Sequence, residues 1–164
     1  MLLTTHHLSL DHQKDLRNLV HDLNLNINPG DKIAIIGEEG NGKSSLLLNL
    51  MDSTLVANYL LQSGSIHRYF HSPVYIPQSL PLEIAELTLN DYFFADMDSD
   101  IDYGLLYLYA DQLQFDSERF ASQQLIESLS GGEKLKIQLI KKLATPSDMI
   151  FLDEPSNDLD LNTL

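Results

Sequence analysis

The residues best suited to chemistry lie in a glycine-rich segment, residues 37–44, which reads Gly-Glu-Glu-Gly-Asn-Gly-Lys-Ser. Glycines at this spacing let successive backbone N–H groups turn toward phosphate oxygens with no Cβ in the way. A helix beginning near Lys43 would add the positive end of its dipole. Lys43 is expected to reach β- and γ-phosphates, and the Ser44 hydroxyl to ligate Mg²⁺. The predicted phosphate-binding residues are Gly37, Gly40, Asn41, Gly42, Lys43, Ser44 and Ser45.

The spacing of this segment could also arise by chance in a glycine-rich turn. Its surroundings favour phosphate binding, because the pattern is informative only between a buried strand and a helix. The continuous apolar run at residues 32–36 predicts a strand buried on both faces, and residues 44–51 predict a helix.

A second group of functional side chains ends another apolar run, residues 149–152. Asp153 is expected to hold Mg²⁺, directly or through water, and Glu154 to orient or deprotonate a water in line with the γ-phosphate. Taken alone, an Asp-Glu pair before Pro155 is more typical of a solvated loop. An acid that ends a strand downstream of a phosphate loop favours the catalytic interpretation.

The segment Leu-Ser-Gly-Gly-Glu, residues 129–133, directly precedes an amphipathic run. Ser130, Gly131 and Gly132 could form a second anion site at a helix N-terminus, or could be only a loop and an N-cap. Two phosphate-binding helix ends far apart in one sequence favour a sandwich, in which each of two domains contributes one of them to a shared nucleotide.

The remaining elements follow from hydrophobic periodicity. Residues 23–27 alternate apolar and polar and predict a half-exposed strand, and residues 28–31, Asn-Pro-Gly-Asp, predict a turn. A short strand is expected at 74–76, mostly helical structure at 82–128, and a strand buried like that at 32–36 at 149–152. Residues 133–144 predict a helix with an apolar stripe of Leu135, Leu139 and Leu143 and with Ile140 beside it, whereas Gln138 lies away from that stripe. Pro146 ends the helix. Strands and helices in this order indicate a parallel α/β sheet.

The order of these motifs resembles the nucleotide-binding domain of ABC ATPases, over about residues 20–164. Residues 37–44 match its Walker A motif, Gln78 its Q-loop glutamine, residues 129–133 its signature motif, 150–154 its Walker B motif and 157–160 its D-loop, with Asp160 at a dimer interface. The resemblance implies an ATPase with ATP and Mg²⁺ as ligands, and Gln78 near the metal and the attacking water. It implies Ser130, Gly131 and Gly132 at the ATP of an opposing domain.

The resemblance also implies a fold and a domain organisation. We expect an α/β P-loop NTPase core with a mainly parallel sheet, an N-terminal antiparallel β element and an inserted helical subdomain. The chain, residues 1–164, would be a single ATP-binding domain with its core at about 1–81 and 132–164 and its insert at about 82–131. The family's switch histidine would follow residue 154 by about thirty positions, whereas the last histidine is His71, so the chain is expected to be an incomplete domain.

The biological setting stays open at this point. Residues 154–160, Glu-Pro-Ser-Asn-Asp-Leu-Asp, resemble a segment of the soluble, ribosome-associated ABC-F proteins. The alternatives are the ATPase subunit of a membrane transporter and a regulatory module that binds nucleotide without hydrolysing it. The expected partners are a second ATPase domain and either a transmembrane transporter subunit or a ribosome. The family usually stacks adenine on an upstream aromatic side chain, for which His12 is the nearest candidate.

Composition bounds these interpretations. The 164 residues are 43% hydrophobic and include no cysteine, which excludes disulfides and thiolate chemistry. The formal net charge of −14 disfavours direct nucleic-acid binding. No apolar stretch approaches a membrane span and no secretory signal is recognisable, so we expect a cytoplasmic location, with the inner membrane face reached only through a partner.

Three other groups of residues are of types that could bind ligands, but their spacing does not fit a functional site. The alternating acids do not fit a calcium loop, because glycine and glutamate are missing at the required positions; they are Asp96, Asp98, Asp100 and Asp102. His6, His7 and His12 lack the spacing of a metal site and are expected on a mobile or surface N-terminus. Tyr103, Tyr107 and Tyr109 are expected in a helix core or a partner-docking face.

Overall fold

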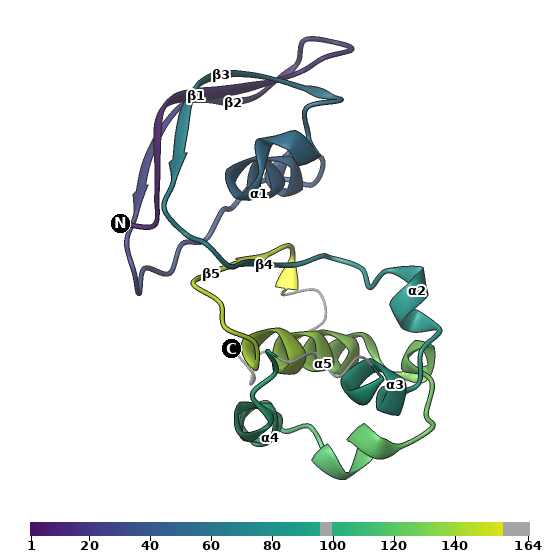
Figure 1. The fold of residues 1–164 in the computed structure, drawn as a ribbon. Coiled ribbons are helices and arrows are strands. Elements are labelled where there is room, and N and C mark those ends of the chain that lie inside the picture. Colours follow the sequence, from purple (N-terminus) through teal and green to yellow (C-terminus); the bar gives the residue numbers. More distant parts are fainter. Residues whose placement is uncertain (96–99, 156–164) are drawn as a thin grey trace. The chain divides into compact units, whose positions relative to one another are not determined.

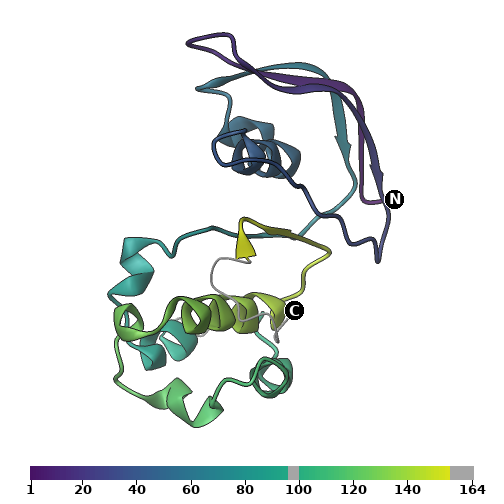
Figure 2. The same cartoon turned by 180° about the vertical axis from the view of Figure 1, so that it is seen from behind.

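The computed structural model of this chain describes residues 1–95 and 100–155. The chain forms two compact units, Met1–Pro73 and Val74–Leu164 (Figures 1 and 2). The first unit contains an antiparallel sheet, one α-helix and one short 3-10 helix. The second contains a small parallel sheet and the remaining helices. An N-terminal antiparallel element and a mainly helical segment after residue 82 are therefore both observed, as the sequence predicts.

The first unit is built on β1 (Leu3–His12), β2 (Asn18–Ile27) and β3 (Leu60–Arg68), in the order β2-β1-β3. Leu3 pairs with Ile27 on one side and with Arg68 on the other. Helix α1 (Lys43–Met51) and the short helix η1 (Ser53–Leu55) complete the unit, and α1 lies inside the curve of the sheet (Figure 1). The core of this unit is formed by Leu3, Leu8, Leu10, Leu46, Leu50, Val56 and Leu60.

The sequence prediction covered part of β2 and missed β1 and β3. The pairing of β1 with β3 shifts register between His6 and Ser9, where His7 has a positive φ of 49°. Opposite this irregularity, Gly64 has φ of 79°, and a Cβ on it would lie 2.3 Å from the His7 carbonyl oxygen. These irregular positions interrupt the alternation on which strand prediction depends.

Hydrogen bonds with side chains of β3 hold helix α1 against the sheet. The Arg68 guanidinium donates to the carbonyl oxygens of Leu50 (2.9 Å) and Asn49 (2.6 Å) and to the Ser53 hydroxyl (2.7 Å). Burial lowers the pKa of Arg68. The Asn49 amide donates to Gln62 at 2.9 Å. Arg68 thus supplies donors to carbonyl groups that the end of a helix leaves without intrahelical partners.

Residues 32–36 differ from the prediction of a buried strand. They are not assigned to a strand, and Ile33 and Ile36 are 48% and 93% exposed. Within the described part of the first unit, the three strands pair with one another and none pairs with residues 32–36. An apolar run indicates a tendency to be buried but does not supply a partner strand, and a strand forms only where its N–H and C=O groups are paired.

The second unit contains β4 (Pro73–Ile76) and β5 (Met149–Leu152), which form a two-stranded parallel sheet. Its helices lie below this sheet in Figure 1. They are α2 (Leu82–Ala85), α3 (Leu89–Phe94), α4 (Tyr103–Gln112), η2 (Ser117–Ala121), η3 (Ile126–Ser128) and α5 (Gly131–Leu143). The strands at 74–76 and 149–152 and the helix before Pro146 are thus confirmed. Burial of β5 is not, because Ile150 and Leu152 are exposed and only Phe151 is buried.

A single apolar cluster holds the helices of this unit together. Phe93 and Phe120 meet at 4.1 Å between ring centroids, and Phe115 stacks on Phe120 at 5.7 Å. The other buried members are Leu89, Tyr92, Ile101, Leu106, Ala110, Ile126, Leu129, Ile137, Ile140 and Ala144. Helix α5 buries Ile137 and Ile140 in this cluster and also buries Leu135. Leu135 and Ile140 are thus buried as predicted, whereas Leu139 and Leu143 are only partly buried. Gln138, predicted to lie outside the stripe, is buried.

We predict that Gly64→Ala destabilises the first unit by about 3 kcal/mol, because the new methyl group meets backbone atoms and the residue retains a left-handed conformation. Gly30→Ala is the matched control. Gly30 has a similar φ of 86° and no atom within 4 Å of an added Cβ, so only about 1 kcal/mol is expected. Urea denaturation of both variants measures the difference, and equal losses would contradict the close approach at Gly64.

Candidate functional site

The predicted phosphate loop leads directly into α1 in the first unit. Gly40 and Gly42 both have left-handed backbone conformations, with φ of 78° and 80°. A Cβ on Gly42 would lie 3.1 Å from a side-chain carbon of Leu19, so glycine is required there for two reasons. Gly42 is the N-cap of α1, with no capping side chain, and the first turn contains no acidic residue. The N–H groups at this helix end are therefore oriented to meet an anion.

Lys43 is the first residue of α1, and its side chain folds back over the loop. Its Nζ donates to the carbonyl oxygens of Gly37 (3.1 Å) and Glu38 (3.0 Å). The amine thus spans the start of the loop, on the same short segment as the N–H groups of residues 40–45. Ser44 and Ser45 follow in the first turn of the helix. This donor set of backbone amides, an ammonium group and hydroxyls fits a phosphate chain, and the Ser44 hydroxyl fits a hard cation such as Mg²⁺.

The predicted acids lie at the end of β5 in the second unit. The Asp153 N–H donates to the Ile76 carbonyl at 3.0 Å, which extends the parallel pairing by one residue. The Asp153 carboxylate is buried and accepts a hydrogen bond of 2.8 Å from the Tyr75 hydroxyl. Tyr75 was not identified as a site residue from the sequence. The sequence feature that could have identified Tyr75 is its position three residues before Gln78.

Glu154 is oriented differently from its neighbour Asp153. It has a left-handed backbone conformation with φ of 49°, which costs about 1 kcal/mol in a residue with a Cβ. Its carboxylate accepts a 2.8 Å hydrogen bond from the Gln78 amide. Gln78, which was assigned from the family resemblance, and Glu154, predicted at the end of a strand 76 residues later, are thus in contact.

Gln78, Asp153 and Glu154 line one cleft of about 350 Å³ within the second unit. Gly131, Leu135 and Gln138 of α5 line it as well. Such an arrangement can hold a carboxylate ready to accept a proton from water while an amide fixes its direction. Within residues 1–95 and 100–155, no three His, Asp or Glu side chains gather as a metal-binding group.

Ser130 begins α5 and forms a capping box with Glu133. The Ser130 hydroxyl accepts from the Glu133 N–H at 3.2 Å, and Glu133 Oε2 accepts from the Ser130 N–H at 3.0 Å. Arg119 donates to Glu133 Oε1 at 2.6 Å. The bond from Arg119, followed by the one from the Ser130 N–H, holds the pKa of Glu133 below its ordinary value. Arg119 was missed from the sequence, although it is the sole Lys or Arg in residues 82–130.

Some predicted residues fall outside this description. Asn157, Asp158 and Asp160 of the predicted D-loop, and Asp96 and Asp98 of the acidic turn, lie outside the described residues. His6 and His7 are exposed on β1, as expected for surface histidines.

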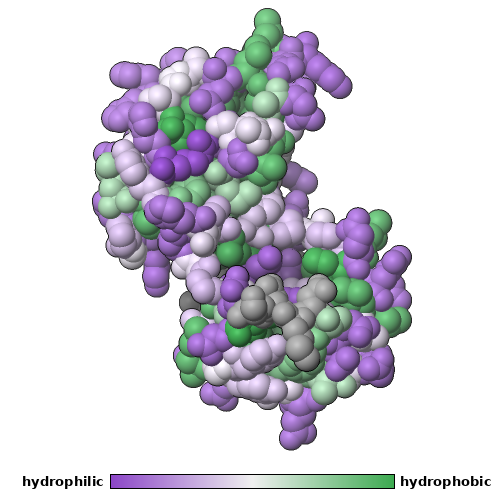
Figure 3. Space-filling view, viewed as in Figure 1, coloured by the Kyte–Doolittle hydropathy of each residue, from purple (hydrophilic) through white to green (hydrophobic). Residues whose placement is uncertain are grey.

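No helix among the described ranges is long and apolar enough to cross a bilayer. On the face drawn in Figure 3, hydrophilic side chains surround scattered hydrophobic ones.

Comparison with known proteins shows one family repeatedly. Residues 20–157 match the family described as ABC transporter. The chain is 31% identical over 153 residues to the ATP-binding protein Uup of Caulobacter vibrioides, covering 90% of this chain and 24% of that protein. It is 33% identical over 143 residues to ABC transporter F family member 5 of Arabidopsis thaliana, covering 84% of this chain and 19% of that protein. The chain thus spans a quarter or less of these relatives.

A solved structure shows the same fold. The structure of cbiO1 from Clostridium perfringens, described as part of the ABC transporter complex cbiONQ, superposes with a TM-score of 0.73. The alignment covers 99% of this chain and 68% of that one, at 18% sequence identity. The predicted fold class is confirmed by this likeness, whereas the division into core and helical insert stays a prediction.

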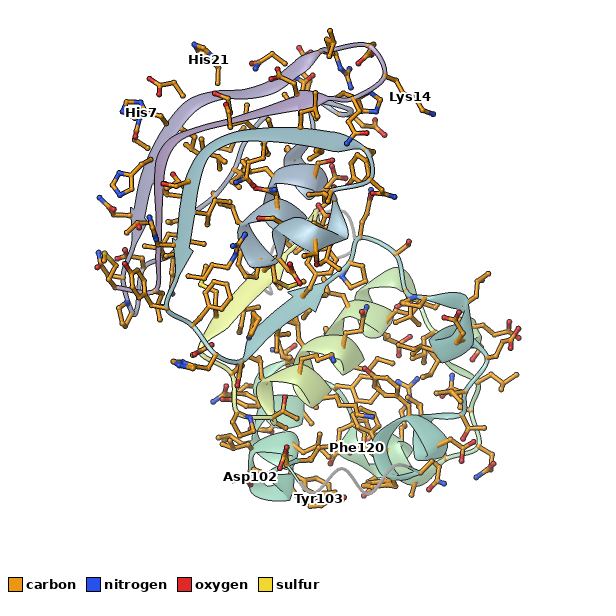
Figure 4. The ribbon with its side chains drawn as sticks, turned by 45° about the horizontal axis from the view of Figure 1, so that its top comes forward. His7, Lys14, His21, Asp102, Tyr103 and Phe120 are labelled. Atoms are coloured by element: carbon orange, nitrogen blue, oxygen red, sulfur yellow. The ribbon has the colours of Figure 1, made fainter. Side chains whose placement is uncertain are left out.

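We predict that Tyr75→Phe lowers the unfolding free energy of the second unit by about 2 kcal/mol, because the buried Asp153 carboxylate loses a short hydrogen bond. Tyr103→Phe, at a half-exposed tyrosine of the same unit that lies at the surface in Figure 4, should change it by less than about 0.5 kcal/mol. Thermal denaturation of the two variants would measure this. A similar, small effect of both substitutions would mean that Asp153 does not depend on Tyr75.

Proposed function

The chain belongs to the ABC transporter family of ATP-binding domains, and from this premise we propose that it binds Mg-ATP, pairs with a second such domain and hydrolyses the nucleotide. The family occurs both in transporter ATP-binding subunits and in proteins of the Uup and ABC-F type, and its members bind ATP, generally with Mg²⁺.

The observation that carries the proposal is the geometry around Lys43. Residues 37–45 combine three features. Gly40 and Gly42 have left-handed conformations, the N-terminus of α1 has no capping side chain, and the Lys43 ammonium group is held by two carbonyl oxygens of the loop. A purely structural turn does not require this combination, because two left-handed glycines lower stability through the unfolded state. A chain of phosphate groups provides a physical reason for all three features.

Asp153, Gln78 and Glu154 would act on the bound nucleotide. Asp153 and Ser44 have the oxygen ligands that Mg²⁺ prefers, and the bound ion would neutralise charge on the phosphates. Glu154 would accept a proton from the attacking water, and the Gln78 amide would hold its carboxylate in position. Ser130, Gly131 and Gly132 would contact the nucleotide of the opposing domain through the N-terminus of α5.

The biological setting is proposed from the relatives. Relatives that are 31% and 33% identical over most of this chain are named Uup and ABC transporter F family member 5, whereas the transporter-complex protein cbiO1 shares the fold at 18% identity. We therefore propose that the chain belongs to an ABC-F-like protein that works in the cytoplasm with the ribosome as its target. The less favoured alternative is a transporter ATPase subunit that docks on a transmembrane partner. Expression of the complete gene product and detection of its bound partner, a ribosome or a membrane protein, would separate the two.

We predict that Lys43→Ala weakens Mg-ATP binding by about a hundredfold, because charge-assisted hydrogen bonds to phosphate are lost. Calorimetric titration measures the affinity. Lys14→Ala is the control, since Lys14 is an exposed lysine between β1 and β2 of the same unit and points away from the sheet (Figure 4). Equal affinities of the wild-type and Lys43→Ala chains, or no binding by either, would overturn the proposed nucleotide site.

We predict that Glu154→Gln slows ATP hydrolysis by at least about a hundredfold while affinity for Mg-ATP changes little, because the amide can still accept the bond from Gln78 but cannot take a proton. Release of inorganic phosphate measures the rate. Glu127→Gln, at an exposed glutamate of the same unit, should leave it unchanged. A rate that survives in Glu154→Gln would remove Glu154 from its proposed role as base.

A further inference from the structure

The two helix ends assigned to phosphate differ in local charge. The N-terminus of α1 has no acid in its first turn, whereas that of α5 contains Glu133. Glu133 Oε2 accepts from the Ser130 N–H at 3.0 Å and from the Ser130 hydroxyl at 3.1 Å. The negative charge of the Glu133 carboxylate therefore lies at the N-terminus of α5. A phosphate group that approaches the same end would be repelled by this carboxylate unless its charge were balanced.

Arg119 supplies that balance. It lies in η2, and its Nη1 donates to Glu133 Oε1 at 2.6 Å. The pair is partly buried, with side-chain exposures of 30% and 32%, so water screens it less than a surface pair. No other Lys or Arg occurs in residues 82–130, a stretch rich in Asp and Glu. Lys134 and Lys136 follow Glu133 on α5 itself, but the ion pair at the Glu133 carboxylate is formed by Arg119.

The orientation of Arg119 is fixed by two further contacts. Its Nη2 donates to Gln124 Oε1 at 3.0 Å, and its guanidinium lies over the Phe115 ring at 4.9 Å from the centroid. A guanidinium already held by these two contacts loses little further entropy when it binds Glu133. The contacts thus run from Phe115 and Gln124 through Arg119 and Glu133 to Ser130.

We propose that Arg119 is a positioning residue for the nucleotide contact of α5: it neutralises and fixes Glu133, so that Ser130 and the N–H groups of Gly131 and Gly132 can meet a phosphate group presented by a second copy of this domain. The inference rests on the proposed function, because it assumes that two domains share a nucleotide. It assigns to Arg119 a role in pairing in addition to its part in packing η2 against α5.

Three variants separate a charge effect from a structural one. Arg119→Gln leaves Glu133 unbalanced, Glu133→Gln removes the charge but keeps a side chain suited to the capping box, and the third variant combines both. The probe is a slowly hydrolysed ATP analogue with Mg²⁺, and the measurement is association of two copies by sedimentation velocity. Thermal denaturation of each variant establishes that it is folded.

We expect Arg119→Gln to weaken nucleotide-dependent association by about tenfold and the double variant to return to the level of Glu133→Gln. The deficit of Arg119→Gln should shrink as salt is raised, because it arises from unbalanced charge. A double variant as weak as Arg119→Gln would show that Arg119 acts only by packing, and would overturn the inference. So would association of Arg119→Gln equal to that of the wild-type chain.

A second measurement does not depend on pairing. An NMR titration of the Glu133 carboxyl should give a pKa below the ordinary value in the wild-type chain and a higher one in Arg119→Gln. An unchanged pKa would overturn the inference while leaving the proposed function intact. Nucleotide binding without any association in the wild-type chain would instead overturn the pairing step of the proposed function, and with it the role of Arg119 in pairing.

Discussion

A chain with a formal net charge of −14 cannot attract phosphate groups through its overall field, so anion binding must depend on donors held at short range. Backbone N–H groups at helix N-termini are such donors, provided that the helix is fixed and its first turn is oriented. The first unit fixes α1 through Arg68 and Asn49, and the second fixes α5 through the apolar cluster around Phe120. Much of the architecture in both units therefore serves to hold two helix ends in place.

The two helix ends meet this requirement in different ways. Gly42 leaves the N–H groups of α1 without a capping side chain, and the left-handed glycines bend the loop over them. Helix α5 is instead closed by a capping box, which stabilises the helix but brings a carboxylate to its mouth. An exposed loop that must wrap a phosphate chain benefits from an uncapped end. In the proposed pairing, the end of α5 must keep its shape until a second domain binds, so a cap stabilises it and the negative charge of that cap needs a partner such as Arg119.

The sequence predicted those parts of the molecule in which local pattern and environment agree. The residues after Gly42 and those before Pro146 are helical, and residues 149–152 are a strand, because turn chemistry and periodicity point the same way there. The prediction for residues 32–36 was wrong because burial of a strand depends on partners that the run itself does not specify. Strands β1 and β3 were missed because left-handed His7 and Gly64 break their alternation. Arg119 was missed because its importance depends on a contact with Glu133, fourteen residues away.

The acidic end of β5 shows how one backbone contact can determine a site. The Asp153 N–H bonds to the carbonyl of Ile76, which lies between Tyr75 and Gln78 in sequence. Once that bond sets the register, Tyr75 can reach the carboxylate of Asp153 and Gln78 that of Glu154. Two consecutive acids in a continued strand would point to opposite faces, and the left-handed conformation of Glu154 redirects the second one toward Gln78. A slip of one residue between β4 and β5 would separate both pairs at once. The strain at Glu154 is therefore tolerated because this conformation brings its carboxylate to the hydrogen bond from Gln78.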